Sequence, residues 1–223
     1  MDLRRTLAEL LGTLLLVAAV VGSGVMAETL AAGNVAVALL ANTVATAAVL
    51  LALITTLGPV SGAHFNPIVT FVEAIEGGLS WRAVPTYVVA QLVGAIAGAG
   101  LAHAMFGLPL YSLSAHERAG ASQVLSEAVA TFGLLVVIGG VSRARPSAVP
   151  ACVAAYIAAA YWFTASTSFA NPAVTIARAL SDTFAGIRPA DVPGFLVGQL
   201  AGAGIALVVR RVLWPKEAKG ATA

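Results

Sequence analysis

Two copies of one short motif carry the side chains of this chain that could do chemistry. Residues 63–70 read AHFNPIVT and residues 168–175 read SFANPAVT, so an Asn precedes a Pro in each copy. Asn followed by Pro starts a helix when Asn is the N-cap and Pro takes the first helical position. Each copy therefore predicts a short helix that presents an amide, which both donates and accepts hydrogen bonds. Asn66 and Asn171 are either plain helix caps or the donors of a site for a polar molecule.

No other group of residues in the chain has the pattern of a catalytic or metal site. There is no Ser-His-Asp set, phosphate-binding loop or dinucleotide-binding fingerprint. His64, His103 and His116 are scattered, and Cys152 is the only cysteine. We therefore expect no enzyme activity, no cofactor and no bound metal.

The composition predicts an integral membrane protein. Of the 223 residues, 59% are hydrophobic and 10% are charged, and the mean hydropathy is +0.93. Soluble domains carry about 25% charged residues, so this chain cannot cover a water-exposed surface with polar side chains. The first apolar run, residues 7–26, contains Glu9 and is too long for a signal peptide, so we expect a retained helix. The net charge of +2 is too small and too dispersed to predict a nucleic-acid partner.

Runs of apolar residues long enough to cross a bilayer recur along the chain. The six predicted spans are residues 5–27, 34–57, 82–106, 121–141, 149–166 and 190–213. The short helices that begin at Pro67 and Pro172 fall after the second and fifth spans and are too short to cross. They are expected to enter the membrane and stop within it.

The distribution of Lys and Arg predicts the orientation, because cytoplasmic loops collect these residues. An even number of spans places both termini on one side, and that side carries nine Lys and Arg against three on the other. The nine are Arg4, Arg5, Arg82, Arg143, Arg145, Arg210, Arg211, Lys216 and Lys219, and the three are Arg118, Arg178 and Arg188. We expect a multi-pass protein of the plasma (inner) membrane with both termini in the cytoplasm.

The chain also contains an internal repeat. A Glu near the start of a span, the Asn-Pro motif and a Gln in a later span recur in the same order, as Glu9, Asn66 and Gln91 and then as Glu127, Asn171 and Gln199. The repeats cover about residues 1–110 and 118–215 of one transmembrane domain, 1–223. Because each repeat has an odd number of spans, the two are inverted relative to each other. The predicted fold is an all-α membrane protein whose half-helices approach the midplane from opposite faces.

The inverted repeat predicts a conduit. Non-helical backbone at membrane depth must be buried in protein or line a water-filled cavity. The backbone before each half-helix is of this kind, and its carbonyls would form a ladder of acceptors at Gly62, Ala63, His64, Thr167 and Phe169. Both helix N-termini would point inward, each worth about half a positive charge, and would repel cations but not neutral molecules. At that depth Asn66 and Asn171 are expected to act as donors to a passing solute and not only as caps.

With these motifs the chain resembles the aquaporin and glycerol-facilitator superfamily. The resemblance rests on the twin motifs, including Ser61 to Pro67, and on the Glu and Gln landmarks, and it covers nearly the whole chain. It implies six spans with two half-helices and a homotetramer with one pore per subunit. Selectivity in such pores comes from their diameter, lining groups and dipoles.

Two positions differ from the family pattern. The first motif ends in Ile68 and not Ala, and Val174 stands where the family has an Arg after the second motif. By family spacing, the other three positions of the selectivity filter are Thr46, Ala159 and Ser168. Such a filter has no aromatic ring and no charge, which implies a pore wider than that of a water or ordinary glycerol channel.

The ending Asn171-Pro172-Ala173-Val174 is similar to that of a bacterial subgroup associated with arsenic-resistance operons. This similarity implies a passive channel for neutral arsenite and other arsenicals, glycerol-like polyols and water, which excludes ions and protons. A water-selective aquaporin is the alternative. An ion-coupled secondary transporter, which an inverted repeat also allows, is the less favoured class.

Two further sets of charged residues have competing interpretations. Glu9 and Glu127, with Gln91 and Gln199, could serve proton transport, but we favour support of the re-entrant loops, whose backbone N–H groups need acceptors. Arg178 lies four residues after Val174 and therefore on the same helical face. It is expected to line the outer vestibule or to pair with Asp182, and the alternative is a displaced filter charge.

Overall fold

The computed structural model describes residues 2–215, which are helical with connecting loops and contain no strand. Lys216 and Lys219, two of the residues used for the orientation, lie outside this range. The spanning helices are α1 (Leu3–Leu30), α2 (Val35–Ser61), α4 (Val84–Met105), α5 (Ala121–Ala144), α6 (Val149–Phe163) and α8 (Val192–Leu213). The half-helices are α3 (Pro67–Glu76) and α7 (Pro172–Arg178), and the short 3-10 turns η1 (Pro146–Ala148) and η2 (Pro189–Asp191) precede α6 and α8.

The structure confirms the six spans, although each has at least one end that differs by one to four residues from the prediction. Helix α2 continues through Pro59 to Ser61, four residues beyond the predicted end at residue 57. Gly62 then ends the helix in a left-handed conformation, with φ of 93°. Helix α6 ends at Phe163, before the predicted end at residue 166, because Thr164 is already extended.

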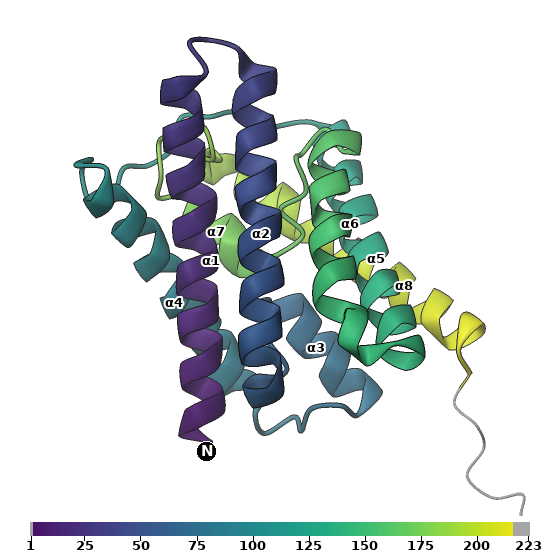
Figure 1. The fold of residues 1–223 in the computed structure, drawn as a ribbon. Coiled ribbons are helices and arrows are strands. Elements are labelled where there is room, and N and C mark those ends of the chain that lie inside the picture. Colours follow the sequence, from purple (N-terminus) through teal and green to yellow (C-terminus); the bar gives the residue numbers. More distant parts are fainter. Residues whose placement is uncertain (1, 216–223) are drawn as a thin grey trace, which may run out of the picture.

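Each half-helix begins as the Asn-Pro pair predicts. The Oδ1 atom of Asn66 accepts from the N–H of Ile68 at 2.9 Å, and Oδ1 of Asn171 accepts from the N–H of Ala173 at 3.0 Å. Helix α3 lies in the lower half of Figure 1 and α7 in the upper half, so their N-termini meet between the spans.

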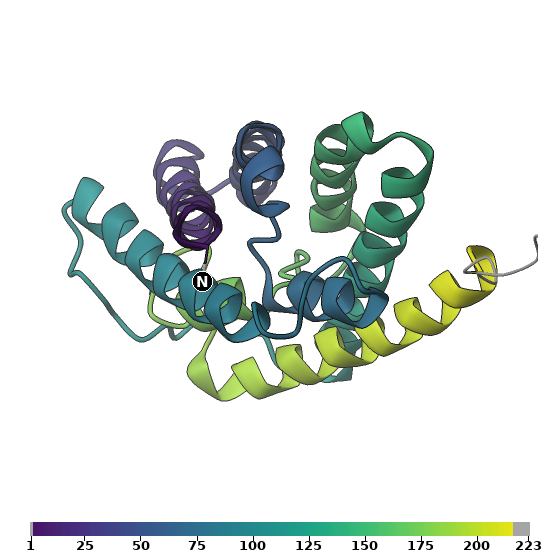
Figure 2. The ribbon, with the colours of Figure 1, turned by 90° about the horizontal axis from the view of Figure 1, so that it is seen from below.

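The spans form two groups that enclose the half-helices. Helix α1 packs against α2 and α4, α5 packs against α6 and α8, and α2 contacts α6 between the groups. The half-helix α3 contacts both α4 and α8, which run at the left and along the lower edge of Figure 2. Gly98 of α4 lies so close to α1 that a Cβ atom would collide with the carbonyl oxygen of Leu14, and Gly202 of α8 has the same relation to Ala128 of α5. Small residues thus permit the close crossings that hold each group together.

Candidate functional site

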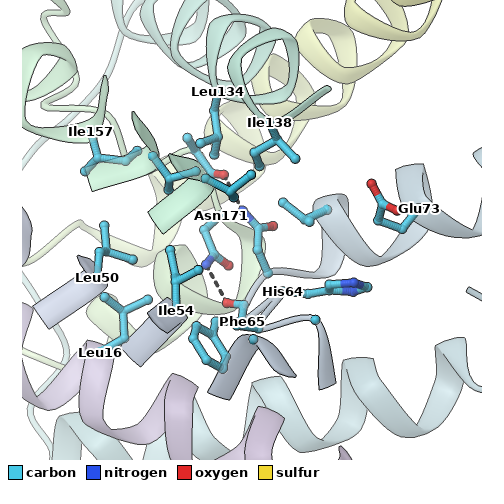
Figure 3. Close-up of a pocket in the computed structure, with 18 of the residues that line it drawn as sticks. Leu16, Leu50, Ile54, His64, Phe65, Glu73, Leu134, Ile138, Ile157 and Asn171 are labelled. Carbon is cyan, nitrogen blue, oxygen red and sulfur yellow. Dashed lines mark hydrogen bonds between the residues drawn. The ribbon is translucent and has the colours of Figure 1, made fainter. Parts of the chain in front are cut away.

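The tips of the two half-helices are joined by reciprocal hydrogen bonds. The Nδ2 atom of Asn66 donates to the carbonyl oxygen of Ala170 at 2.7 Å, and Nδ2 of Asn171 donates to that of Phe65 at 2.8 Å (Figure 3). Both side chains are buried, and both line the central cavity. Because an amide carries two N–H groups, each Asn keeps a second donor beyond the bond that joins the tips.

The backbone that leads to each tip adopts conformations that favour glycine. Ala63 and Phe65 have φ of 50° and 49°, and Ser168 and Ala170 have φ of 51° and 47°. Such left-handed residues cost about 1–3 kcal/mol each and persist only where the surroundings hold them. The two loops therefore need strong support.

Glu9 of α1 holds the first loop. Its Oε1 atom accepts from Oγ of Ser61 at 2.6 Å and from the N–H of His64 at 3.0 Å. Its Oε2 atom accepts from the N–H of Phe65 at 2.8 Å and from Nε2 of Gln91 at 2.8 Å. Four donors thus surround a fully buried carboxylate, so both of its oxygens have hydrogen-bond partners.

Glu127 of α5 repeats this arrangement at the second loop. Its Oε1 atom accepts from Oγ of Ser166 at 2.7 Å and from the N–H of Phe169 at 2.9 Å. Its Oε2 atom accepts from the N–H of Ala170 at 2.8 Å and from Nε2 of Gln199 at 2.6 Å. The contacts of both Glu residues are those expected of support for a loop.

The sequence does not predict the role of four hydroxyl residues in these networks. Ser61 and Ser166 donate to the two carboxylates. Thr70 and Thr175 accept from Nε2 of Gln91 and of Gln199, each at 2.9 Å. The signal that could have found them is the repeat itself, because each pair occupies equivalent places around the two Asn residues.

A cavity of about 670 Å³ runs past the paired Asn residues. We call the end near the start of α1 and the half-helix α3 the lower mouth, and the end near α7 the upper end, after the places of these helices in Figure 1. Its walls away from the loops are apolar, and Leu50, Leu134 and Ile157 are among the side chains that surround the amides in Figure 3. The lower mouth is lined by Arg5, Glu73, Glu76, Arg143 and Arg210, and the upper end by Thr46, Tyr161, Ser168, Val174 and Arg178.

Three of the four predicted filter residues meet at the upper end, and one does not. Thr46, Ser168 and Val174 line the cavity, but Ala159 is exposed on α6 and does not. Ile157 of the same helix faces the cavity, and two residues further on a helix turns by about 200°, so Ala159 points away. The prediction for Ala159 is therefore wrong.

Tyr161 takes the place that was assigned to Ala159. It lies one helical turn beyond Ile157, and its hydroxyl donates to Oγ1 of Thr46 at 3.3 Å. The upper end thus contains an aromatic ring, contrary to the expectation. Ser168 contributes to the cavity lining, and its Oγ atom is buried without a hydrogen-bond partner within residues 2–215.

Two more residues lie elsewhere than predicted. Thr167 does not line the cavity, and its Oγ1 accepts from Nη1 of Arg118 at 3.5 Å. The carbonyl-ladder expectation is therefore corrected at Thr167, while Gly62, Ala63, His64 and Phe169 line the cavity. Ile68 packs with Leu135 and Ala206 away from the cavity, so the departure from Asn-Pro-Ala alters packing and not the lining.

Arg178 is buried in the wall of the cavity, where it is only 2% exposed. It makes no salt bridge with Asp182: Oδ1 of Asp182 instead accepts from the N–H of Ala115 at 2.9 Å. Asp182 lines a separate recess with Glu28 and His116. The predicted pairing of Arg178 with Asp182 is therefore wrong, whereas its predicted place in the outer vestibule stays a prediction.

The sequence also does not predict a cluster of ion pairs at the lower mouth. Nη2 of Arg210 lies 2.5 Å from Oε2 of Glu76 and 4.0 Å from Oε1 of Glu73, and Nη2 of Arg143 lies 3.6 Å from Oε2 of Glu76. These contacts join α3 to α5 and α8. Because the partners are far apart in the sequence and on different helices, no local pattern indicates them.

Six spans, two half-helices that meet tip to tip and a cavity along them define the class of the aquaporin-like membrane channels. The fold matches that of a solved structure, the aquaglyceroporin from Plasmodium falciparum, with a TM-score of 0.69 over 97% of both chains at 19% identity. Residues 1–158 match the family described as "Major intrinsic protein". The chain belongs to this major intrinsic protein family.

Relatives in this family are similar over nearly the whole chain. "Aquaglyceroporin AqpS" of Rhizobium meliloti (strain 1021) is 57% identical over 210 residues, which cover 94% of this chain and 90% of the relative. "Aquaporin TIP1-2" of Zea mays is 32% identical over 95% of this chain and 86% of that protein.

Proposed function

We propose that residues 1–223 form a single passive channel domain for small uncharged solutes. The solutes are glycerol-like polyols, neutral arsenite and other neutral arsenicals, and water, and ions and protons are excluded. The observation that carries the proposal is the continuous cavity past two Asn amides that are fixed tip to tip, each with an N–H group to spare. The high identity to a relative named as an aquaglyceroporin supports the solute class.

The cavity wall suits a small molecule with several hydroxyl groups. Carbonyl groups and amides along the half-helices replace the hydrogen bonds that the solute gives up in water. The opposite wall, which includes Leu50 and Ile157, accommodates the carbon or arsenic side of the solute without competing for those bonds. An ion loses far more solvation than such a wall returns, and the N-termini of α3 and α7 add about half a positive charge each against cations.

At the upper end, the proposed filter consists of Thr46, Tyr161, Ser168 and Val174. Val174 has a short apolar side chain where an Arg would place a long donor fork. Thr46, Tyr161 and Ser168 leave hydroxyl groups near the passage. The combination favours neutral polyhydroxy solutes larger than water.

The proposal includes the assembly and the location. A homotetramer with one pore per subunit fits the many large apolar side chains exposed on the outer helices, such as Val44 at 60% and Val129 at 41%. Some of these faces would meet lipid and others a second subunit. The excess of Lys and Arg near the termini supports a plasma-membrane protein with cytoplasmic ends.

Solute flux into liposomes that contain the purified protein tests this function. We expect glycerol and arsenite to enter at rates that rise linearly with concentration and do not respond to a proton gradient, well above those of empty vesicles. Solute rates equal to those of empty vesicles, with fast water flux, would identify a water-selective pore instead. Saturating flux that follows the proton gradient would identify a coupled transporter.

A further inference from the structure

The positively charged side chain of Arg178 lines the cavity beside the proposed filter, which itself has no charged residue. Arg178 is the last residue of α7 and follows Val174 by one helical turn, so both residues face the same side. Its Nε donates to the carbonyl oxygen of Ala185. This bond holds one edge of the planar guanidinium and leaves the two Nη groups at the other edge, and the residue lines the cavity.

The guanidinium of Arg178 is further fixed by an aromatic ring. Its Cζ lies 3.4 Å from the centre of the Phe169 ring. That ring is buried in the loop before Asn171 and packs edge-on against the ring of Phe195, with 4.9 Å between the two ring centres. The charge of Arg178 is therefore held at one position relative to the passage and does not swing on a flexible side chain.

No carboxylate forms a salt bridge with Arg178 among residues 2–215. Glu127 is occupied by its four donors, and Asp182 accepts from the loop that contains Ala115. A buried charge without a partner is unfavourable unless water solvates it, and the cavity is the source of water at this place. Glu73 occupies the equivalent position in the first repeat, and the arginines Arg143 and Arg210 at the lower mouth are paired with carboxylates, unlike Arg178.

A second arginine lies beside the same ring. Cζ of Arg118, from the loop between α4 and α5, is 5.0 Å from the centre of Phe169. Its Nε donates to the carbonyl oxygen of Gly186 at 2.8 Å and its Nη1 to that of Ser166 at 3.3 Å. Burial lowers the pKa of Arg118 to about 10, so the side chain stays cationic at neutral pH.

We propose that Arg178, with Arg118 behind it, is the selectivity charge of this pore. The pair excludes cations, including protons, in place of the filter Arg that Val174 replaces, and the Nη groups of Arg178 donate hydrogen bonds to neutral solutes. The displacement by one turn keeps the charge near the passage while Val174 leaves the filter wide. This inference rests on the proposed channel function and assigns its ion exclusion to two named residues.

Proton leak into liposomes tests the inference. Vesicles with an internal pH dye and a potassium diffusion potential report proton entry, and glycerol flux in the same preparation shows that the channel has inserted. We expect Arg178→Gln to raise proton leak at least tenfold, Arg118→Gln to raise it less, and Arg178→Lys to stay near the wild type. Arg211→Gln, at an exposed arginine outside the cavity, is the matched control and should not leak.

The double variant Val174→Arg with Arg178→Gln separates charge from structure. If the charge matters, an Arg at position 174 restores low leak, whereas a pore that leaks because it is misfolded is not rescued. Wild-type leak in Arg178→Gln, or no rescue by the double variant, would overturn the inference. If Arg178→Gln does not insert into the vesicles, Arg118→Gln serves as the test instead. A proton leak of Arg118→Gln equal to that of the wild type would then overturn the inference. Failure of the channel function would appear separately, as absent solute flux in the wild type.

Discussion

Replacing Glu127 by Gln changes one atom of the network that holds the second re-entrant loop. The carboxylate accepts from two backbone N–H groups, those of Phe169 and Ala170, one at each oxygen. An amide has one oxygen and one NH₂ group, so one of these N–H groups must face a donor. Ser166 can rotate its hydroxyl to accept from the NH₂ group, and Gln199 can turn its unpartnered Oε1 toward it. A backbone N–H cannot adapt in this way.

The cost of Glu127→Gln therefore equals at least one charge-assisted hydrogen bond and one buried N–H left without an acceptor. Each such loss is about 1.5–3 kcal/mol, and the two overlap, so we expect about 2–3 kcal/mol. For a chain of this size that lowers the melting temperature by about 4–12 °C. Because the loop supplies the carbonyl of Ala170 to Asn66, solute flux should fall as well.

Thermal unfolding in detergent and glycerol flux in liposomes measure these two effects. Glu117→Gln is the matched control, because the side chain of Glu117 is 66% exposed and makes only a surface ion pair with Arg188 at 3.6 Å. A melting temperature of Glu127→Gln within 1–2 °C of the control corresponds to a loss of stability of only about 0.5 kcal/mol. That result, together with normal flux, would refute the reasoning.

Three further substitutions test other parts of the structure. Gly98→Leu places a side chain against the backbone of α1 and should abolish stable folding, as judged by size-exclusion chromatography. The control Gly204→Ala meets open space and should fold normally. Normal elution of Gly98→Leu would contradict the close packing of α4 on α1. Arg210→Gln removes the buried member of the ion-pair cluster at the lower mouth and should lower the free energy of unfolding by about 3–5 kcal/mol. Thermal unfolding measures this loss, and a fall in melting temperature of less than about 2 °C would contradict a structural role. Tyr161→Ala should speed glycerol flux severalfold relative to water, while Ala159→Val should leave the ratio unchanged, and the opposite result would return Ala159 to the pore.

Much of the fold follows from the sequence because it depends on local and repeated signals. Hydropathy predicts the spans, and the Asn-Pro pairs predict the starts of α3 and α7. The repeat also places Glu9 and Glu127 near the two loops, where a buried carboxylate must find donors and the loop N–H groups must find acceptors. The structure supplies those contacts atom by atom.

The upper end of the cavity was harder to predict, because it depends on loop geometry. Counting back from Asn171 without gaps gives Ala159, but the loop after α6 begins at Thr164 and is not helical. An error of two residues turns a helical position by about 200°, from the cavity to the opposite face. Arg118 was missed for a related reason, since a residue in a long loop has no periodicity that indicates its contacts.

The most direct test of the central claim compares water, glycerol and arsenite flux for the wild type and Val174→Arg in the same liposome preparation. The proposed channel passes all three in the wild type, and Arg at position 174 should slow glycerol and arsenite at least tenfold while water flux falls much less. A wild type that passes water alone would contradict the claim. An equal fall of all three rates in the variant, with the protein correctly inserted, would contradict the assignment of Val174 to the filter.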